Sequence, residues 1–325
     1  MARVTLIGYN NKEYEEKVDP KIEEALELTG KYPTLWLDIL DPDKEVIQKL
    51  DTVFGIDPLA LEDVVNGNQR PKIEDYGEVT FIVLRIPMSG GIERSEQLNI
   101  FITKQMVITL HSAAIDLAKD IKPMIYSHAP WLVRGKSDRL AYVVIDKAVD
   151  AFFPTINEIA ERLERIEKEV IENSDKTTMK KIHDTRWEII LMRRILGHIS
   201  DVLMVMIRGS APNVSKDVRT QLRDVHDHIL RHLDHVDAFR EMLNSLTEIY
   251  VSNISMRINK IITLLTAITF IFMPLTLIAA IYGMNFRYMP ELNWEWGYPF
   301  TLGLMLFVGL LTYYIFKKKG WLYGE

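Results

Sequence analysis

An asparagine directly follows a long uncharged apolar run, in the tetrapeptide Tyr282-Gly283-Met284-Asn285. The run covers residues 261–282 and is long enough to be a helix, whose C-terminal end carries a partial negative charge. The amide oxygen of Asn285 is a neutral acceptor near that end, so a ring of such oxygens would hydrogen-bond the water shell of a hydrated cation. We expect Gly283 to let the chain leave the helix, because glycine takes the left-handed conformation at little cost.

The same apolar run carries small or mildly polar side chains at steps of three and four residues. These positions share one face of the predicted helix: Asn259, Ile262, Leu265, Thr269, Met273, Thr276 and Ala280. Such a face can line a path for ions through a membrane. Threonine and alanine also serve close packing between membrane helices, so ordinary packing is the alternative. The face has no carboxylate, which would bind a cation tightly and slow its exit.

Three histidines, His228, His232 and His235, follow one another at spacings of four and three residues. On a helix this spacing puts the three imidazoles on one face, where they can bind a transition-metal ion. The alternative is a solvated face, on which Arg231 and the neighbouring aspartates form surface ion pairs. The sequence favours the solvated face and leaves the metal site open.

Two uncharged apolar runs, residues 261–282 and 296–316, are each long enough to cross a membrane as a helix. The segment between them, 283–295, contains one arginine and two glutamates. Basic residues flank the two runs on their other sides: Arg257, Lys260, Lys317, Lys318 and Lys319. Because such residues stay in the cytoplasm, we expect a multi-pass protein of the cell membrane with both termini cytoplasmic and 283–295 outside. Residues 317–325 would then form a basic cytosolic tail.

The composition argues against several classes of function. The net charge is −6 over 325 residues and no segment carries a basic stripe, which argues against a nucleic-acid partner. The chain has no cysteine, so disulfides and thiolate chemistry are excluded. It contains neither a phosphate-binding loop nor a nucleophile–base pair. We therefore expect neither an enzyme nor a resident cofactor.

Residues 1–130 are predicted to form a cytosolic α/β domain. Runs rich in β-branched residues predict strands, and Ser89-Gly90-Gly91 predicts a turn between two of them. The expected strands are 4–8, 35–40, 79–86, 98–103 and 106–111, and the expected helix is 43–54.

Residues 137–260 are predicted to form the long helices of a cytosolic stalk. Ser137 and Asp175 are candidate N-caps, and Pro154 is expected to interrupt the first helix. The stretch 214–273 has neither glycine nor proline and keeps apolar residues at helical spacing. It therefore predicts one continuous helix that runs from the cytosol into the first membrane span.

Gly-Met-Asn at the end of a first membrane span, followed by a short loop and a second span, resembles the CorA family of Mg²⁺ channels. Further similar stretches cover nearly the whole chain. They are Pro58-Leu59-Ala60-Leu61-Glu62-Asp63-Val64, Arg70-Pro71-Lys72, Ile271-Phe272-Met273-Pro274-Leu275-Thr276, Met289-Pro290-Glu291-Leu292 and Lys317-Lys318-Lys319. Because Mg²⁺ dehydrates reluctantly, a filter of neutral amide oxygens around the hydrated ion suits it.

The resemblance implies a funnel-shaped homopentamer, in which an α/β N-terminal cytosolic domain is followed by long helices and a two-helix transmembrane hairpin. Two spans per chain cannot enclose an aqueous path, so conduction of any ion would require an oligomer. The implied function is a gated Mg²⁺ channel that mediates divalent cation influx and is closed by cytosolic Mg²⁺. Mg²⁺ would then be both the transported and the regulatory ion. A transporter of Zn²⁺, Co²⁺ or Ni²⁺ from the same family is the alternative, supported by the histidines.

The resemblance also implies roles for single residues. The selectivity filter would be Gly283, Met284 and Asn285, and the pore-lining residues would be Asn259, Ile262, Leu265, Met273 and Thr276. Lys317, Lys318 and Lys319 would form a basic collar around the inner mouth. Asp224, within Arg223-Asp224-Val225-His226-Asp227-His228, would hold a regulatory cation together with an acidic residue of the neighbouring subunit. The hairpin of this chain that matches the family's acidic segment, residues 88–93, has no aspartate, so Glu93 is the candidate partner.

Overall fold

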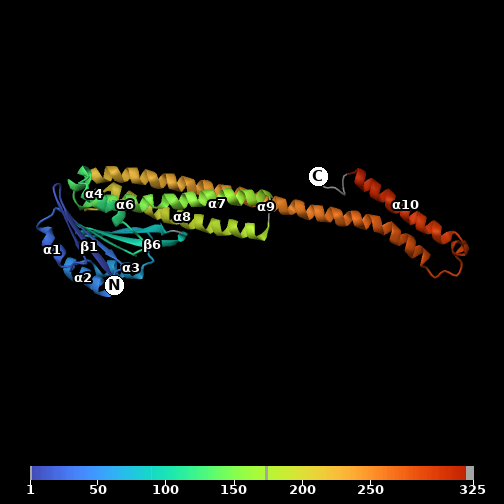
Figure 1. Cartoon of the computed structure of the whole chain (residues 1–325), viewed down its shortest axis with the longest axis horizontal. Coiled ribbons are helices and arrows are strands. Elements are labelled where there is room, and N and C mark those ends of the chain that lie inside the picture. The colour runs from blue at the N-terminus through green and yellow to red at the C-terminus, as the bar shows by residue number, and fades with distance from the viewer. Residues whose placement is uncertain (1, 89, 173–174, 320–325) are drawn as a thin grey trace. The chain divides into compact units, whose positions relative to one another are not determined.

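The computed structural model describes residues 2–88, 90–172 and 175–319, and its elements are labelled in Figure 1. Two compact units make up the chain. The first consists of Met1–Glu169 and Asp175–Leu246, and the second of Val170–Ser174 and Thr247–Glu325.

A seven-stranded mixed sheet lies in the first unit, with the strand order β2-β1-β3-β7-β6-β5-β4. Its strands are β1 (Arg3–Tyr9), β2 (Tyr14–Val18), β3 (Thr34–Leu40), β4 (Lys72–Tyr76), β5 (Val79–Met88), β6 (Gly91–Ile102) and β7 (Met106–His111). β3 pairs in parallel with β7, placing Leu37 opposite Ile108, and the remaining pairs are antiparallel. All the strands predicted from the sequence are present. Ser89 of the predicted turn lies outside the described residues.

Helices cover both faces of this sheet (Figure 1). α1 (Glu24–Thr29), α2 (Lys44–Phe54) and α3 (Pro58–Asn66) close one face around a buried apolar cluster that includes Leu6, Leu37, Leu50 and Phe81. α4 (Ala118–Tyr126) and α5 (Pro130–Val133) lead to α6 (Ser137–Asp150). α6 and α8 (Lys176–Arg208) both contact the sheet strands. Because both faces are covered, β5 and β7 are apolar nearly throughout instead of alternating.

The helix expected from Ser137 onward is divided at Ala151 into α6 and α7 (Phe152–Glu172). Pro154 lies in the first turn of α7, where the missing N–H breaks no helical hydrogen bond, so the proline marks an interruption as predicted. The prediction of Ser137 as an N-cap is wrong. Ser137 is already the first residue of α6, and its hydroxyl donates to the carbonyl oxygen of Thr103 at the end of the sheet.

α8 begins where the sequence predicts. The carboxylate of Asp175 caps it, accepting hydrogen bonds from the backbone N–H groups of Thr177 and Thr178 at 2.8 and 2.9 Å. The helix ends at Gly209, whose φ of 89° lies in the left-handed region that glycine adopts most easily. α7, α8 and the first part of the following helix run side by side in the first unit (Figure 1).

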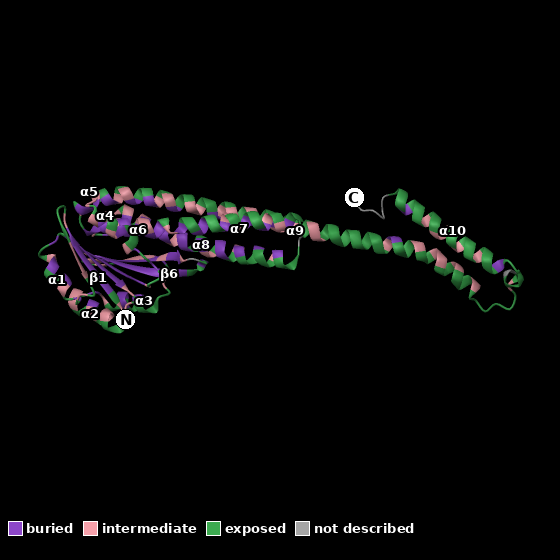
Figure 2. Ribbon diagram, in the orientation of Figure 1, coloured by how far each residue is buried: buried purple, intermediate pink, exposed green. Residues whose placement is uncertain are grey.

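α9 (Lys216–Tyr282) is one helix of 67 residues. The stretch without glycine and proline predicts it as far as Met273, and the helix continues through Pro274. Its C-terminal part belongs to the second unit, together with a short 3-10 helix (Pro290–Asn293) and α10 (Gly297–Lys318). α9 and α10 each contain a stretch long and apolar enough to cross a membrane, and nearly all residues of these stretches are unburied in the single chain (Figure 2). The two spans predicted from the sequence lie at these positions.

Candidate functional site

The segment predicted to form a filter lies at the C-terminal end of α9. Tyr282 is the last helical residue, and the N–H of Gly283 still donates to the carbonyl oxygen of Ala279 at 3.0 Å. Met284 and Asn285 follow in an exposed, irregular segment. The amide of Asn285 is therefore three residues beyond the helix end, close to its partial negative charge.

Gly283 does not take the left-handed conformation, so the reason given for it from the sequence is wrong. Its backbone instead prolongs the last turn of α9. A Cβ atom at this position would lie 3.3 Å from the carbonyl oxygen of Ala279 and 3.6 Å from that of Ala280. Glycine fits here because it avoids a tight contact with the end of the helix.

The predicted pore-lining face of α9 is exposed in the single chain. Ile262, Leu265 and Met273 are 54%, 63% and 63% exposed, and Asn259 and Thr276 are exposed as well. A contiguous apolar surface of this kind suits contact with lipid or with other copies of the chain.

Thr276 and Thr269 orient their hydroxyl groups in the same way. Each donates to the carbonyl oxygen four residues earlier, that of Phe272 or Leu265, at 2.9 Å. The hydroxyl hydrogen is thereby used within the helix, and the oxygen offers lone pairs to the surroundings. Water bound to a cation points its hydrogens outward. These threonine oxygens are therefore suited to accept hydrogen bonds from a hydrated cation.

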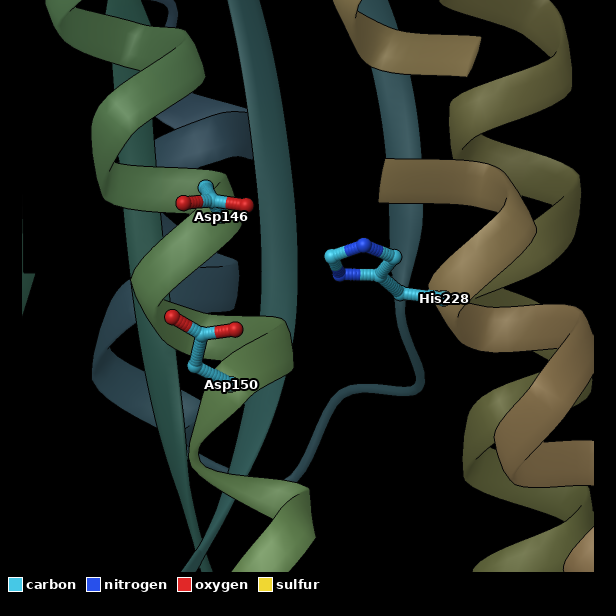
Figure 3. A group of neighbouring side chains, drawn as sticks. All are labelled: Asp146, Asp150 and His228. Carbon is cyan, nitrogen blue, oxygen red and sulfur yellow. The ribbon is translucent and has the colours of Figure 1, made fainter. Parts of the chain in front are cut away.

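A group of possible cation ligands lies in the first unit, between α6 and α9. Asp146 and Asp150 come from consecutive turns of α6, and His228 of α9 faces them (Figure 3). One ligand atom from each residue lies within 4.8 Å of the other two. Asp224, the predicted regulatory residue, lies one turn before His228, with a carboxylate oxygen 3.7 Å from its Nε2. The structure thus places Asp224 beside this group.

The surroundings of Asp146 disfavour its charged form. Burial raises the pKa of Asp146, and the charges of Asp150 and Asp224 raise it further. Burial and the same three carboxylates raise the pKa of Tyr142 to about 12. Lys147 offsets part of the repulsion, because its Nζ lies 2.6 Å from Asp150 and 3.8 Å from Asp146. A bound divalent cation would relieve the rest.

Asp146 and Asp150 are not among the candidate ligands predicted from the sequence. Their spacing of four residues on a helix places both carboxylates on one face, which is a signal that the sequence offers. What it does not offer is the packing of α6 against α9, which brings in His228 from nearly eighty residues away.

The three histidines line one side of a cavity of about 490 Å³ between α7 and α9. Within the described part of the chain, His228 belongs to a three-residue ligand group, whereas His232 and His235 do not. Burial lowers the pKa of His232, and the neighbouring imidazoles and Arg231 lower it further. The shared face predicted from the spacing is present, but around His232 it is half buried instead of solvated.

Glu93, the candidate partner of Asp224, lies on β6 near Glu188 of α8. Burial raises the pKa of Glu188, the Arg162 ion pair opposes this, and the charge of Glu93 adds to the rise. The pairing of Asp224 with Glu93 between subunits stays a prediction. The basic collar also stays a prediction. Lys317 and Lys318 lie in the last turn of α10, and residues 320–325 lie outside the described residues.

An α/β domain, long helices and an apolar hairpin whose first helix is followed by Gly-Met-Asn define a class of membrane proteins, and comparison with known proteins identifies it. Residues 33–318 match the family model described as CorA-like Mg²⁺ transporter protein. The cobalt/magnesium transport protein CorA of Thermotoga maritima is 33% identical over 323 residues, which cover 98% of this chain and 92% of that protein. The chain therefore belongs to the CorA-like Mg²⁺ transporter family.

Two further proteins agree with this assignment. The putative metal ion transporter YfjQ of Bacillus subtilis is 32% identical over 288 residues, which cover 88% of this chain and 89% of that protein. The complete structure of the CorA magnesium transporter from Methanocaldococcus jannaschii has a TM-score of 0.84 and 24% identity, covering 98% of both chains. At this identity the likeness concerns the fold. It confirms the predicted fold of an α/β domain, long helices and a two-helix hairpin.

Proposed function

We propose that this chain forms a gated Mg²⁺ channel of the cell membrane that mediates divalent cation influx. The observation that carries the proposal is the position of Asn285 directly beyond an exposed helix face on which Thr276 also offers an oxygen acceptor. Neutral oxygens hold a hydrated Mg²⁺ by its water shell without stripping it. The names of the relatives, which transport magnesium or cobalt, support the same ion class.

The conducting form is a homopentamer with a funnel-shaped cytosolic part and both termini in the cytoplasm. One apolar hairpin cannot enclose a path, whereas a ring of α9 helices can. The exposure of Ile262, Leu265 and Met273 supports this arrangement, because each then faces the same residues of other copies as a hydrophobic constriction. The membrane potential drives influx, contributing about 4.6 kcal/mol for a divalent ion per 100 mV, at about 2.3 per charge.

Cytosolic Mg²⁺ closes the channel by binding the carboxylates near the start of α9. Asp146 and Asp150 supply the facing oxygens and Asp224 lies beside them, so an empty group is repulsive and a filled one attracts α6 to α9. Asp224 can in addition reach an acidic residue of the neighbouring subunit, with Glu93 as the candidate.

Ion flux into proteoliposomes tests the channel. Asn285→Ala should lose most of the Mg²⁺ uptake that the wild type shows under an inside-negative potential, with the oligomer intact by size-exclusion chromatography. Asn293→Ala, in the short 3-10 helix of the same loop, is the matched control and should keep normal uptake. Full uptake by a well-assembled Asn285→Ala oligomer would refute the filter.

Transport of Zn²⁺, Co²⁺ or Ni²⁺ is the second candidate function. The half-buried His232 in the histidine-lined cavity favours it, and so does the cobalt in the name of the Thermotoga maritima relative. Competition of each ion against Mg²⁺ in the same flux assay separates transport of Mg²⁺ from transport of a transition-metal ion. Mg²⁺ transport requires that Mg²⁺ itself moves and that the wild type prefers it over the others at equal concentration.

A further inference from the structure

A cavity of about 380 Å³ lies in the second unit, beside the segment predicted to form the filter. Ala279 and Tyr282, from the last turn of α9, line one part of it, and residues of the first turns of α10 line another. Trp294 and Glu295 of the connecting loop line it as well. The cavity therefore lies where the two apolar helices meet their loop, which in a membrane is the level of the interface with water.

The lining becomes more polar toward the loop. Ala279, Leu302 and Met305 belong to the two apolar helices and contribute hydrocarbon. Trp294 and Tyr298, at or next to the loop, contribute aromatic rings that each carry one polar group. A lining graded in this way matches an amphiphile whose tail lies along the helices and whose head lies at the loop.

Groups of opposite charge border the loop end of the cavity. Glu295 contributes a carboxylate, which makes no ion pair within the described part of the chain. Gly297 and Tyr298 begin α10, a helix of 22 residues whose first N–H groups carry a partial positive charge. The cap residue, Trp296, offers these groups no side-chain hydrogen bond. An uncapped helix start suits a phosphate, and a carboxylate beside aromatic rings suits an ammonium group.

These charges favour one kind of amphiphile over others. Of the described lining residues only Glu295 is acidic, whereas a divalent cation is held by several oxygen ligands. A lipid with a net negative headgroup would be repelled by this carboxylate, and a choline headgroup has no N–H to donate to it. A headgroup with one phosphate and one primary ammonium meets both the helix start and the carboxylate.

We propose that this cavity binds a phospholipid whose headgroup ends in a primary ammonium, as in phosphatidylethanolamine. The ammonium lies beside Glu295 and the rings of Trp294 and Tyr298, the phosphate lies at the start of α10, and one acyl chain follows the apolar lining. The effect on transport rests on the proposed function. Because Tyr282 directly precedes Gly283, a lipid against Tyr282 steadies the end of α9 and raises Mg²⁺ uptake.

Native mass spectrometry of the full-length oligomer in detergent tests the site, with ethanolamine, choline and glycerol phospholipids of identical acyl chains. Wild type should retain the ethanolamine lipid preferentially. Glu295→Gln and Trp294→Leu should each weaken its binding by roughly threefold, the size of one exposed ion pair or cation–π contact. Trp296→Leu and Glu248→Gln are the matched controls, because both residues are exposed and lie outside the lining. Equal retention of the three lipids, or an unchanged preference in both test variants, would overturn the site.

A cysteine substitution distinguishes a lipid from a second copy of the chain, because the chain contains no cysteine. Leu302→Cys should react with a membrane-permeant thiol reagent in the delipidated oligomer, and added ethanolamine lipid should slow this reaction. Leu306→Cys, on α10 but outside the lining, should react at the same rate with and without the lipid. Protection of the cysteine at 302 that does not depend on lipid would show that another copy fills the cavity, which contradicts the proposal.

Mg²⁺ uptake in proteoliposomes separates this inference from the proposed function. Replacing the choline lipid by the ethanolamine lipid should raise wild-type uptake by roughly threefold, in line with the change in binding, and should leave Glu295→Gln unaffected. If lipid binding depends on Glu295 but no Mg²⁺ moves, the channel fails and the lipid site stands. If uptake is normal while lipid binding is indifferent to Glu295, the channel stands and the lipid site fails.

Discussion

The imidazole of His111 lies 3.0 Å from a carboxylate oxygen of Asp38, and both side chains are buried in the sheet. The other ring nitrogen lies 2.9 Å from the carbonyl oxygen of Ser112. Both ring nitrogens thus face oxygen acceptors, an arrangement that favours the charged imidazolium. Thr109 also donates to Asp38 and accepts from the indole of Trp36. The parallel strands β3 and β7 are thus joined by a buried ion pair.

The stability of the α/β domain should fall as the pH rises above 6.5. Burial lowers the pKa of His111, but the hydrogen bond to Asp38 and its charge outweigh this and raise the pKa above 6.5. A raised pKa stabilises the fold fully below 6.5, and the contribution is lost as pH rises through the folded value. His111→Gln should remove this pH dependence. It should also lower the free energy of unfolding below pH 6.5 by about 3–5 kcal/mol, because Asp38 stays buried without its partner. Urea unfolding at several pH values measures both, and a parallel pH slope in the variant would contradict the prediction.

Polar substitution on the exposed face of α9 should make the closed channel leak. Met273→Asn or Leu265→Asn would wet a hydrophobic constriction, so basal conductance should rise with Mg²⁺ present on the cytosolic side. Leu264→Asn is the control, because Leu264 is 52% exposed on the same helix but lies off the predicted face. Planar-bilayer recording measures the currents. Unchanged conductance in both test variants would remove these residues as constrictions.

Thr276→Val should slow Mg²⁺ uptake while preserving the shape of the helix. The substitution removes one oxygen acceptor per subunit, worth about 0.5–1.5 kcal/mol, or roughly two- to tenfold in rate. Thr312 of α10 donates to Val308 at 2.8 Å in the same manner, so Thr312→Val is the matched control. Uptake in proteoliposomes is the measurement. Equal rates for the two variants would show that Thr276 does not contact the hydrated ion.

Asp146→Asn should stabilise the protein without Mg²⁺ and reduce the stabilisation that Mg²⁺ provides. It removes a carboxylate whose charge is disfavoured by burial and by Asp150, so the melting temperature in chelator should rise by roughly a few degrees. Bound Mg²⁺ stabilises the wild type by about 1.4 kcal/mol at ten times its dissociation constant. Asp201→Asn, an exposed carboxylate on α8, should leave both values unchanged. An equal Mg²⁺ shift in Asp146→Asn and wild type would place the ion elsewhere.

The sequence predicts the long elements well because their signals are local. The stretch without glycine or proline defines α9, and Asp175 is a cap that needs no distant partner. β2 and β4 were missed because they are edge strands rich in charge, Tyr14–Val18 and Lys72–Tyr76, as edges that avoid aggregation tend to be.

The candidate site residues also fall into two kinds, those found from a local motif and those that depend on the packing of distant segments. Gly283 and Asn285 are found by motif, but the backbone conformation of Gly283 depends on where the last helical turn ends. The ligand group of Asp146, Asp150 and His228 depends on the packing of two helices far apart in sequence. Spacing within α6 shows which residues share a face but not which element that face meets.

The ammonium group of Lys147 already occupies a position beside the carboxylates of Asp146 and Asp150. Its ammonium lies 2.6 Å from Asp150, one residue away from Asp146, so the oxygens proposed to hold a divalent ion are already partly neutralised. Filling the group is therefore an exchange of one tethered cation for a free one. The local concentration of that ammonium is fixed by a covalent link and does not vary with the state of the cell, so it provides a constant reference against which the divalent ion competes. In the proposed regulation, the length of one lysine side chain helps to set the concentration of divalent ion at which α6 and α9 are joined.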